Sequence, residues 1–141
     1  MSSHQALLIF HLLVIALGIG FSTSNFINTR LAIGNEGHVQ KGLALQRMTI
    51  SRWGDGIIAL IWLSGGLLLW QRGMEGLPGV FHAKMLFVVL LTLCHGMTRA
   101  TGGRMQREKN LALLPRLSLF VGGVVISAVV ALVCAVLAFE A

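Results

Sequence analysis

Four long apolar runs dominate this chain. They cover about residues 5–31, 51–71, 79–99 and 112–139, and none alternates apolar and polar residues as a half-buried strand would. A helix needs roughly 20 apolar residues to cross a hydrocarbon core ~30 Å thick, and each run meets or approaches that length. Because a spanning segment must satisfy its own backbone hydrogen bonds, the runs predict helices. We therefore expect residues 1–141 to form one all-α domain, an integral membrane four-helix bundle.

The composition supports a membrane protein. The chain is 55% hydrophobic and 11% charged, whereas a soluble domain has about 25% charged residues. The mean hydropathy is +0.81. The first run has no Lys or Arg before it, and it is longer than the roughly 7–15-residue apolar core of a secretory signal. We expect that run to be retained as a spanning helix in contact with the lipid bilayer.

The basic residues predict the orientation. Nine of the eleven Lys and Arg residues lie in or beside the first–second and third–fourth connections: Arg30, Lys41, Arg47, Arg52, Arg99, Arg104, Arg107, Lys109 and Arg116. With four spans, these two connections share one side. The positive-inside rule places them in the cytoplasm and both termini outside. We expect a multi-pass protein of the bacterial cytoplasmic (inner) membrane, with its positive charge directed to lipid headgroups and not to nucleic acid.

The connections carry their own signals. Residues 34–37 predict the end of the first helix, and residues 38–50 predict a short interfacial helix. The glycine-rich residues 73–79 predict a tight outer turn. Residues 101–103, Thr-Gly-Gly, predict a break in the third helix, and Pro115 fits the first turns of the fourth.

Ionisable residues inside a span are costly, so each is a functional candidate. His11 lies about two turns into the first span from the outer side, and Lys84 lies at a similar depth in the third. His95 is near the cytoplasmic end of the third span, and Asp55 is near the start of the second on that same side. We expect His11 and Lys84 to be level with each other.

Helical phase sorts these residues further. At about 100° per residue, Lys84 and His95 are about 20° from eclipsed and share one face, whereas His82 points elsewhere. His11 and Gly18 also share a face, where Gly18 leaves room for a flat ligand or for a neighbouring helix.

Structural roles compete with these functional ones. Lys84 can extend to the outer headgroups, and a histidine in a span can simply hydrogen-bond between helices. Asp55 can cap its helix and pair with Arg52.

The segment Phe81–Gly96, FHAKMLFVVLLTLCHG, is the most informative stretch. It resembles a helix of the HemJ-type protoporphyrinogen oxidase family of membrane proteins, which reads approximately Leu-His-Ala-Lys-Leu with a second His thirteen residues after the first. The wider CopD-like membrane group looks similar. His11 occupies the position of that family's first-helix His, and Arg30 falls near its Arg at the end of that helix.

The resemblance implies haem b held between helices and the oxidation of protoporphyrinogen IX, with electrons passed toward quinone. Imidazole and neutral Lys are suitable haem ligands, and propionates favour Arg partners. The resemblance therefore implies a role for each candidate residue. His11 and Lys84 would be metal ligands, His82 and Arg99 would be further cofactor contacts, and His95 and Arg30 would be catalytic residues. Partners beyond the bilayer would be quinone or porphyrinogen, and a larger membrane complex or a homo-oligomer.

One stretch departs from the family pattern. The family usually carries Trp and Tyr-Leu-Pro-Arg in the second half of its first helix, but Phe21–Arg30 holds no Trp, Tyr or Pro. Three alternatives therefore stay open: a relative that kept the haem and lost the oxidase activity, a non-enzymatic small subunit or assembly factor of a larger membrane electron-transfer complex, and a CopD-like copper-handling protein.

The charge pattern makes a topology prediction. Single cysteines placed in residues 34–50 or 101–110, in a background without Cys94 and Cys134, should resist impermeant thiol reagents in intact cells, whereas cysteines in residues 73–78 should react. Labelling of residues 101–110 from outside intact cells would overturn the orientation.

Overall fold

The computed structural model describes residues 2–73, 77 and 79–140 of the chain. Four long helices account for most of these residues: α1 (Ser3–Ile33), α2 (Gly37–Arg72), α3 (Gly79–Glu108) and α4 (Leu114–Glu140), with a short 3-10 helix η1 (Leu111–Leu113) before α4. All four long helices have the length and apolar composition needed to cross a membrane. The predicted all-α membrane bundle is confirmed, and the chain is a multi-pass membrane protein by these criteria.

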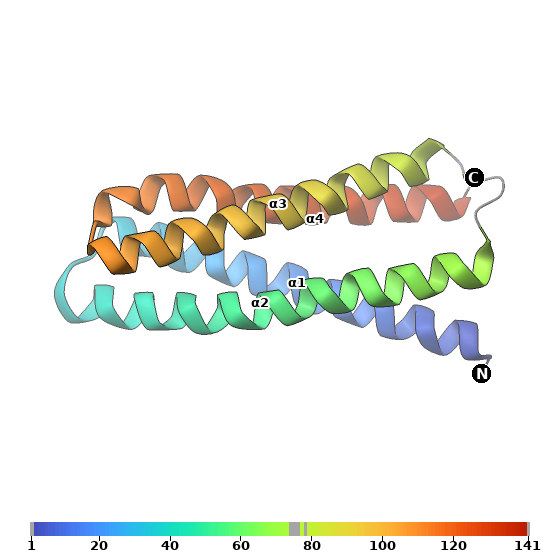
Figure 1. The fold of residues 1–141 in the computed structure, drawn as a ribbon, viewed down its shortest axis with the longest axis horizontal. Helices are drawn as coiled ribbons and strands as arrows, with labels where there is room; N and C mark the ends of the chain where they lie inside the picture. Colours follow the sequence, from blue (N-terminus) through green and yellow to red (C-terminus); the bar gives the residue numbers. More distant parts are fainter. Residues whose placement is uncertain (1, 74–76, 78, 141) are drawn as a thin grey trace.

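The helices run up and down, so consecutive helices are antiparallel (Figure 1). The connections at 34–36 and 109–113 lie at one end of the bundle, here called the basic end because the basic residues flank them. Both termini lie at the other end, here called the terminal end. The two basic connections thus share one side of the bundle.

Packing within the bundle is uneven. α3 packs closely along α4, and α1 packs against both α2 and α4, whereas α2 and α3 scarcely touch. A buried cluster at the basic end joins α1, α3 and α4: Ala32, Met105, Leu114, Leu117 and Val121. Many large apolar side chains lie on the outside, including Leu13, Leu63 and Leu119, which suits a surface covered by lipid. The sparse contact between α2 and α3 is the feature that shapes the site.

Small residues allow α4 to approach its neighbours. A Cβ atom on Gly123 would lie 2.9 Å from the Sγ atom of Cys94 on α3. A Cβ atom on Gly122 would lie 3.3 Å from the ring of Phe26 on α1. Close backbone approach at small residues is the usual basis of helix packing in membranes, and it explains why α4 is the helix with close contacts to both α1 and α3.

Two predictions about helix boundaries were wrong. Residues 38–50 are not a separate interfacial helix, since α2 runs unbroken from Gly37 to Arg72. Residues 101–103 do not break α3, which continues to Glu108. Each glycine costs a helix only about 1 kcal/mol relative to alanine, and buried Thr101 and Met105 hold this stretch against its neighbours.

The remaining boundaries follow local signals. α1 begins at a capping box made by Ser2 and Gln5, and it ends before Gly34 as predicted. α3 ends where Lys109 takes a φ of 48°. Pro115 is the second residue of α4, where its missing N–H leaves no hydrogen bond unmade. The predicted turn at 73–79 falls mostly on residues 74–76 and 78, which lie outside the described residues.

The packing predicts an asymmetry between two valines of α4. Val121 is 1% exposed and Val129 is 44% exposed. Val121→Ala should lower the free energy of unfolding by about 1–3 kcal/mol, because it leaves a cavity among packed side chains. Val129 faces the surrounding lipid, so Val129→Ala should change the free energy of unfolding little. Thermal unfolding of the purified variants in one detergent measures the difference, and equal effects would contradict this core.

Candidate functional site

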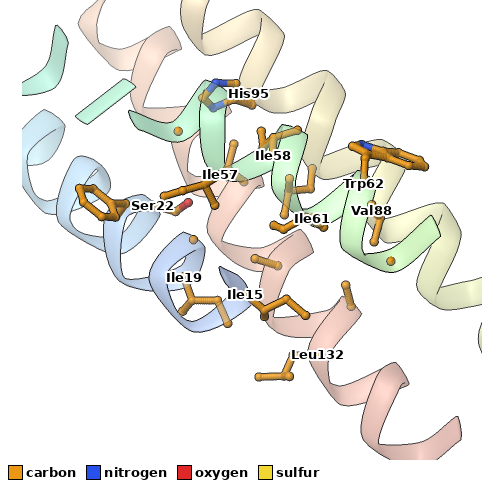
Figure 2. A pocket seen from close by; sticks show the side chains of 18 of the residues that line it. Ile15, Ile19, Ser22, Ile57, Ile58, Ile61, Trp62, Val88, His95 and Leu132 are labelled. Atoms are coloured by element: carbon orange, nitrogen blue, oxygen red, sulfur yellow. The ribbon is translucent and has the colours of Figure 1, made fainter. Parts of the chain in front are cut away.

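A cavity lies between the four helices and receives side chains from each of them (Figure 2). Its walls are mainly aliphatic: Ile15 and Ile19 from α1, Ile57, Ile58 and Ile61 from α2, Val88 from α3 and Leu132 from α4. The space between the atoms amounts to about 1340 Å³, its open mouth included. Ionisable side chains enter this apolar cavity at two places, one toward each end of the bundle.

His11 lines the cavity toward the terminal end. It is 5% exposed, and its Nδ1 atom lies 2.7 Å from the hydroxyl oxygen of Ser64 on α2. The next residue, Gly65, lies against the imidazole, because a Cβ atom there would be 3.3 Å from the Cε1 atom of His11. Ser64 and Gly65 together fix the position of the ring.

The hydrogen bonds also determine which ring nitrogen of His11 carries the proton. The Ser64 hydroxyl oxygen lies 2.5 Å from the Leu60 carbonyl oxygen, and two oxygens at that distance need a proton between them. Ser64 has only one proton, so the Nδ1–H group of His11 donates to Ser64. The Nε2 atom therefore keeps its lone pair, and it has no hydrogen-bond partner among the described side chains.

Two cations accompany His11. Lys84 lines the same cavity, with its Nζ atom 6.0 Å from the centroid of the Phe81 ring. Arg72 lines an adjoining space that also contains His11 and Lys84. A free imidazole nitrogen and two basic side chains are thus gathered toward the terminal end of the cavity.

His95 lines the cavity toward the basic end. Its Nε2 atom lies 2.7 Å from one Asp55 oxygen, and the guanidinium of Arg99 lies 3.2 Å from the other. A Cβ atom on Gly54 would lie 2.7 Å from the Cε1 atom of His95, so the ring needs a glycine at that position. The expected pairing of Asp55 with Arg52 is not found, because both Asp55 oxygens are engaged by α3.

Helix α2 holds both histidines by the same device. Each imidazole rests on a glycine of α2 and bonds to the side chain beside that glycine. Gly54 and Gly65 are eleven residues apart, which places them about 20° from eclipsed on one helix face. Sequence reasoning missed Ser64, Gly54 and Gly65 as site residues. The signal was the eleven-residue spacing on α2, which equals the spacing of Lys84 and His95 on α3.

The other sequence candidates lie elsewhere. His82 and Arg30 are exposed, and neither forms part of the cavity wall. The space beside Gly18 is taken by α2, since a Cβ atom there would lie 3.1 Å from the Cγ2 atom of Ile57. Of the two uses open to Gly18, the structure shows the one for a neighbouring helix.

The contact between Gly54 and His95 makes a testable prediction. Gly54→Ala should lower the free energy of unfolding by about 1–3 kcal/mol, because the new methyl group displaces the ring from Asp55. Gly56→Ala is the matched control, since its Cβ atom meets nothing within 4 Å, and it should stabilise α2 by up to about 1 kcal/mol. Thermal unfolding provides the measurement. In a His95→Ala background the cost of Gly54→Ala should vanish, and a persistent cost would contradict the assigned contact.

Comparison with known proteins assigns no family to this chain. No family model, no curated protein and no solved structure matches it. The resemblance of the Phe81–Gly96 segment to the HemJ-type family therefore stays a prediction.

Proposed function

We propose that this chain is a haem-b-binding membrane oxidoreductase resembling the HemJ-type family, in which His11 would hold haem b in the interhelical cavity. The observation that carries the proposal is the hydrogen-bond chain from His11 through Ser64 to Leu60. It leaves the His11 Nε2 lone pair available beside an apolar cavity, which is the arrangement that a metal-ligating histidine requires.

The donor set favours haem over a free metal ion. No group of three or more His, Cys, Asp or Glu side chains in the described part of the chain is placed to hold a metal ion. A haem iron needs only one or two protein ligands, because the porphyrin supplies the others. The aliphatic walls suit a flat apolar macrocycle, and cofactor sites are typically apolar with a few well-placed polar groups.

Ser64 acts as a positioning residue. A ligating histidine almost always donates its second N–H to a fixed acceptor, which sets the tautomer and the ring orientation. Here the acceptor is the Ser64 hydroxyl oxygen on α2. Gly65 lets the ring lie close to the α2 backbone.

Lys84 and Arg72 supply positive charge beside His11. Carboxylate groups pair strongly with such cations through charge-assisted hydrogen bonds. We assign both residues to the propionates of a haem or of a porphyrinogen substrate. Lys84 would serve instead as the second metal ligand that the resemblance implies in its neutral form, and the propionates would then be left to Arg72.

His95 and Asp55 form an acid–base pair toward the other end of the cavity. The Asp55 carboxylate accepts from the Nε2–H group of His95, so Nδ1 is the nitrogen free to accept a proton. Asp55 can stabilise the imidazolium that results, and Arg99 holds the second Asp55 oxygen. A bound haem would supply one-electron transfer, and His95 would take up the protons released when a porphyrinogen is oxidised with quinone as acceptor.

A non-enzymatic subunit of a larger membrane complex is the second candidate. Helices α2 and α3 scarcely touch, and polar contacts such as Trp62 to Thr92 link them. A helix of a partner protein could occupy the cavity between them. The absorbance spectrum of the purified protein distinguishes the two functions, because the haem-binding oxidoreductase should show a Soret band.

The haem proposal predicts a graded response to substitution. The purified wild type should show the Soret band of haem b, and His11→Ala should lose it while the protein still accumulates. Ser64→Ala should weaken haem binding about 10- to 100-fold, because the ring is no longer held. Lys84→Ala should also lose haem, and His95→Ala should reduce oxidase activity more than haem content. His82→Ala is the matched control, since His82 is exposed outside the cavity.

Three results would contradict the site. If His11→Ala keeps a normal spectrum while His82→Ala loses it, the face of α3 assigned to the cavity is wrong. An unchanged spectrum in Lys84→Ala removes that residue from the ligand set. A wild type without haem in every preparation would leave the non-enzymatic subunit as the leading function.

A further inference from the structure

Arg47 of α2 is a buried cation at the basic end of the bundle. The residue is 6% exposed, and its Nη1 group donates to the side-chain oxygen of Asn28 on α1 at 3.4 Å. Its Nη2 group is buried and has no hydrogen-bond partner within the described part of the chain. An arginine stays protonated in proteins, so this guanidinium is a buried charge with an unused pair of donors.

The carboxylates of the basic end do not neutralise Arg47. Asp55 is engaged by His95 and Arg99, and Glu108 pairs with Arg104. Glu36 forms none of the ion pairs found in the described residues. A buried charge without a counter-charge costs several kcal/mol, so a site of this kind favours an anion from outside the chain.

A second cavity lies beside Arg47 and adjoins the apolar one, with which it shares Asn25, Ser51 and Thr98. Its wall contains three arginines, namely Arg47 and Arg52 of α2 and Arg99 of α3. Polar side chains join them, including Asn25, Ser51 and Thr98. No carboxylate among the described residues lines this wall, and Asp55 pairs with Arg99, which does line it. The cavity therefore has a positive and hydrogen-bonding lining.

We propose that this cavity binds a phosphate group through Arg47, with Arg52 and Arg99 completing the site. Guanidinium groups match phosphate oxygens with two parallel hydrogen bonds. Three arginines against one Asp55 carboxylate leave an excess of positive charge, which suits a phosphate better than a neutral ligand. Ser51 offers a hydroxyl donor to the same oxygens, whereas the hydroxyl of Thr98 already donates to the Cys94 carbonyl oxygen.

Two sources share this chemistry. One is an anionic phospholipid headgroup, since basic pockets between membrane helices bind such headgroups. The other is a free phosphate or a phosphate ester from the adjoining aqueous phase. The phosphate site does not rest on haem binding, because none of its three arginines lines the apolar cavity, although Arg99 also bonds to Asp55 of the proposed acid–base pair.

The test uses the full-length chain in phosphatidylcholine nanodiscs and follows its Tm. One arm adds inorganic phosphate, with chloride at equal ionic strength as the reference. The other arm replaces part of the phosphatidylcholine with phosphatidylglycerol. A rise in Tm in the first arm assigns the site to free phosphate, and a rise in the second assigns it to the lipid headgroup.

Substitutions tie the effect to Arg47. Arg47→Met should weaken binding of the active probe about 10- to 100-fold, because a charge-assisted hydrogen bond is worth about 1.5–3 kcal/mol. Without any anion this variant should be at least as stable as the wild type, since a buried unpaired charge has been removed. Arg47→Lys keeps the charge and loses the paired donors, so it should bind more weakly than the wild type. Arg30→Met removes an exposed cation from the same end and should bind as the wild type does.

Two results would overturn the proposal. One is a wild-type Tm that responds to neither probe, which would mean that neither added phosphate nor the anionic headgroup binds at Arg47. The other is an equal response in Arg47→Met and Arg30→Met, which would mean a general attraction between the basic end and anions. The wild-type measurement stands even if Arg47→Met does not accumulate.

Discussion

A polar group in a membrane-spanning bundle has no water to bond with, so it needs a partner from within the protein. Helix α2 meets this constraint twice on one face. Ser64 holds the imidazole of His11, and Asp55 holds that of His95. Because α2 and α3 scarcely touch, few links join them: polar contacts to Asp55 and Trp62, and the close approach of the His95 ring to Gly54. The central cavity depends on this division, since α4 packs tightly with α1 and α3 while α2 stands apart from α3.

The two ends of the cavity differ in the charged side chains that lie near the histidine at each end. Toward the terminal end, an imidazole nitrogen with a free lone pair lies near Lys84 and Arg72. Toward the basic end, His95 is hydrogen-bonded to a carboxylate. A single apolar ligand would thus meet an imidazole nitrogen with a free lone pair and basic side chains on one side, and an imidazole paired with a carboxylate on the other. The arginine-lined space around Arg47 lies beyond His95, toward the basic end, and has a different chemistry from both.

Regular spacing carried the predictions that agree with the structure. Lys84 and His95 both line the cavity because eleven residues return a helix close to the same angle. Spacing along one helix could not predict which side chains form hydrogen bonds or ion pairs across helices. Asp55 was expected to pair with Arg52 on its own helix, yet it bonds to α3. The glycine at 18 faces Ile57, and the proton position on His11 depends on a serine 53 residues away. Residues 101–103 stayed helical because buried contacts outweigh the weak local preference of two glycines.

The sequence by itself determined the class of the protein, the number of helices, their antiparallel order and the clustering of basic residues at one end. These properties follow from run length, hydropathy and charge, which are local and additive along the chain. Only the tertiary structure decided which histidine nitrogen is free, which carboxylate faces which cation, and which arginine is buried without a counter-charge. Those outcomes depend on the rotation of each helix against its neighbours. That rotation is set by close approach at a few glycines, so no single segment of the sequence encodes it.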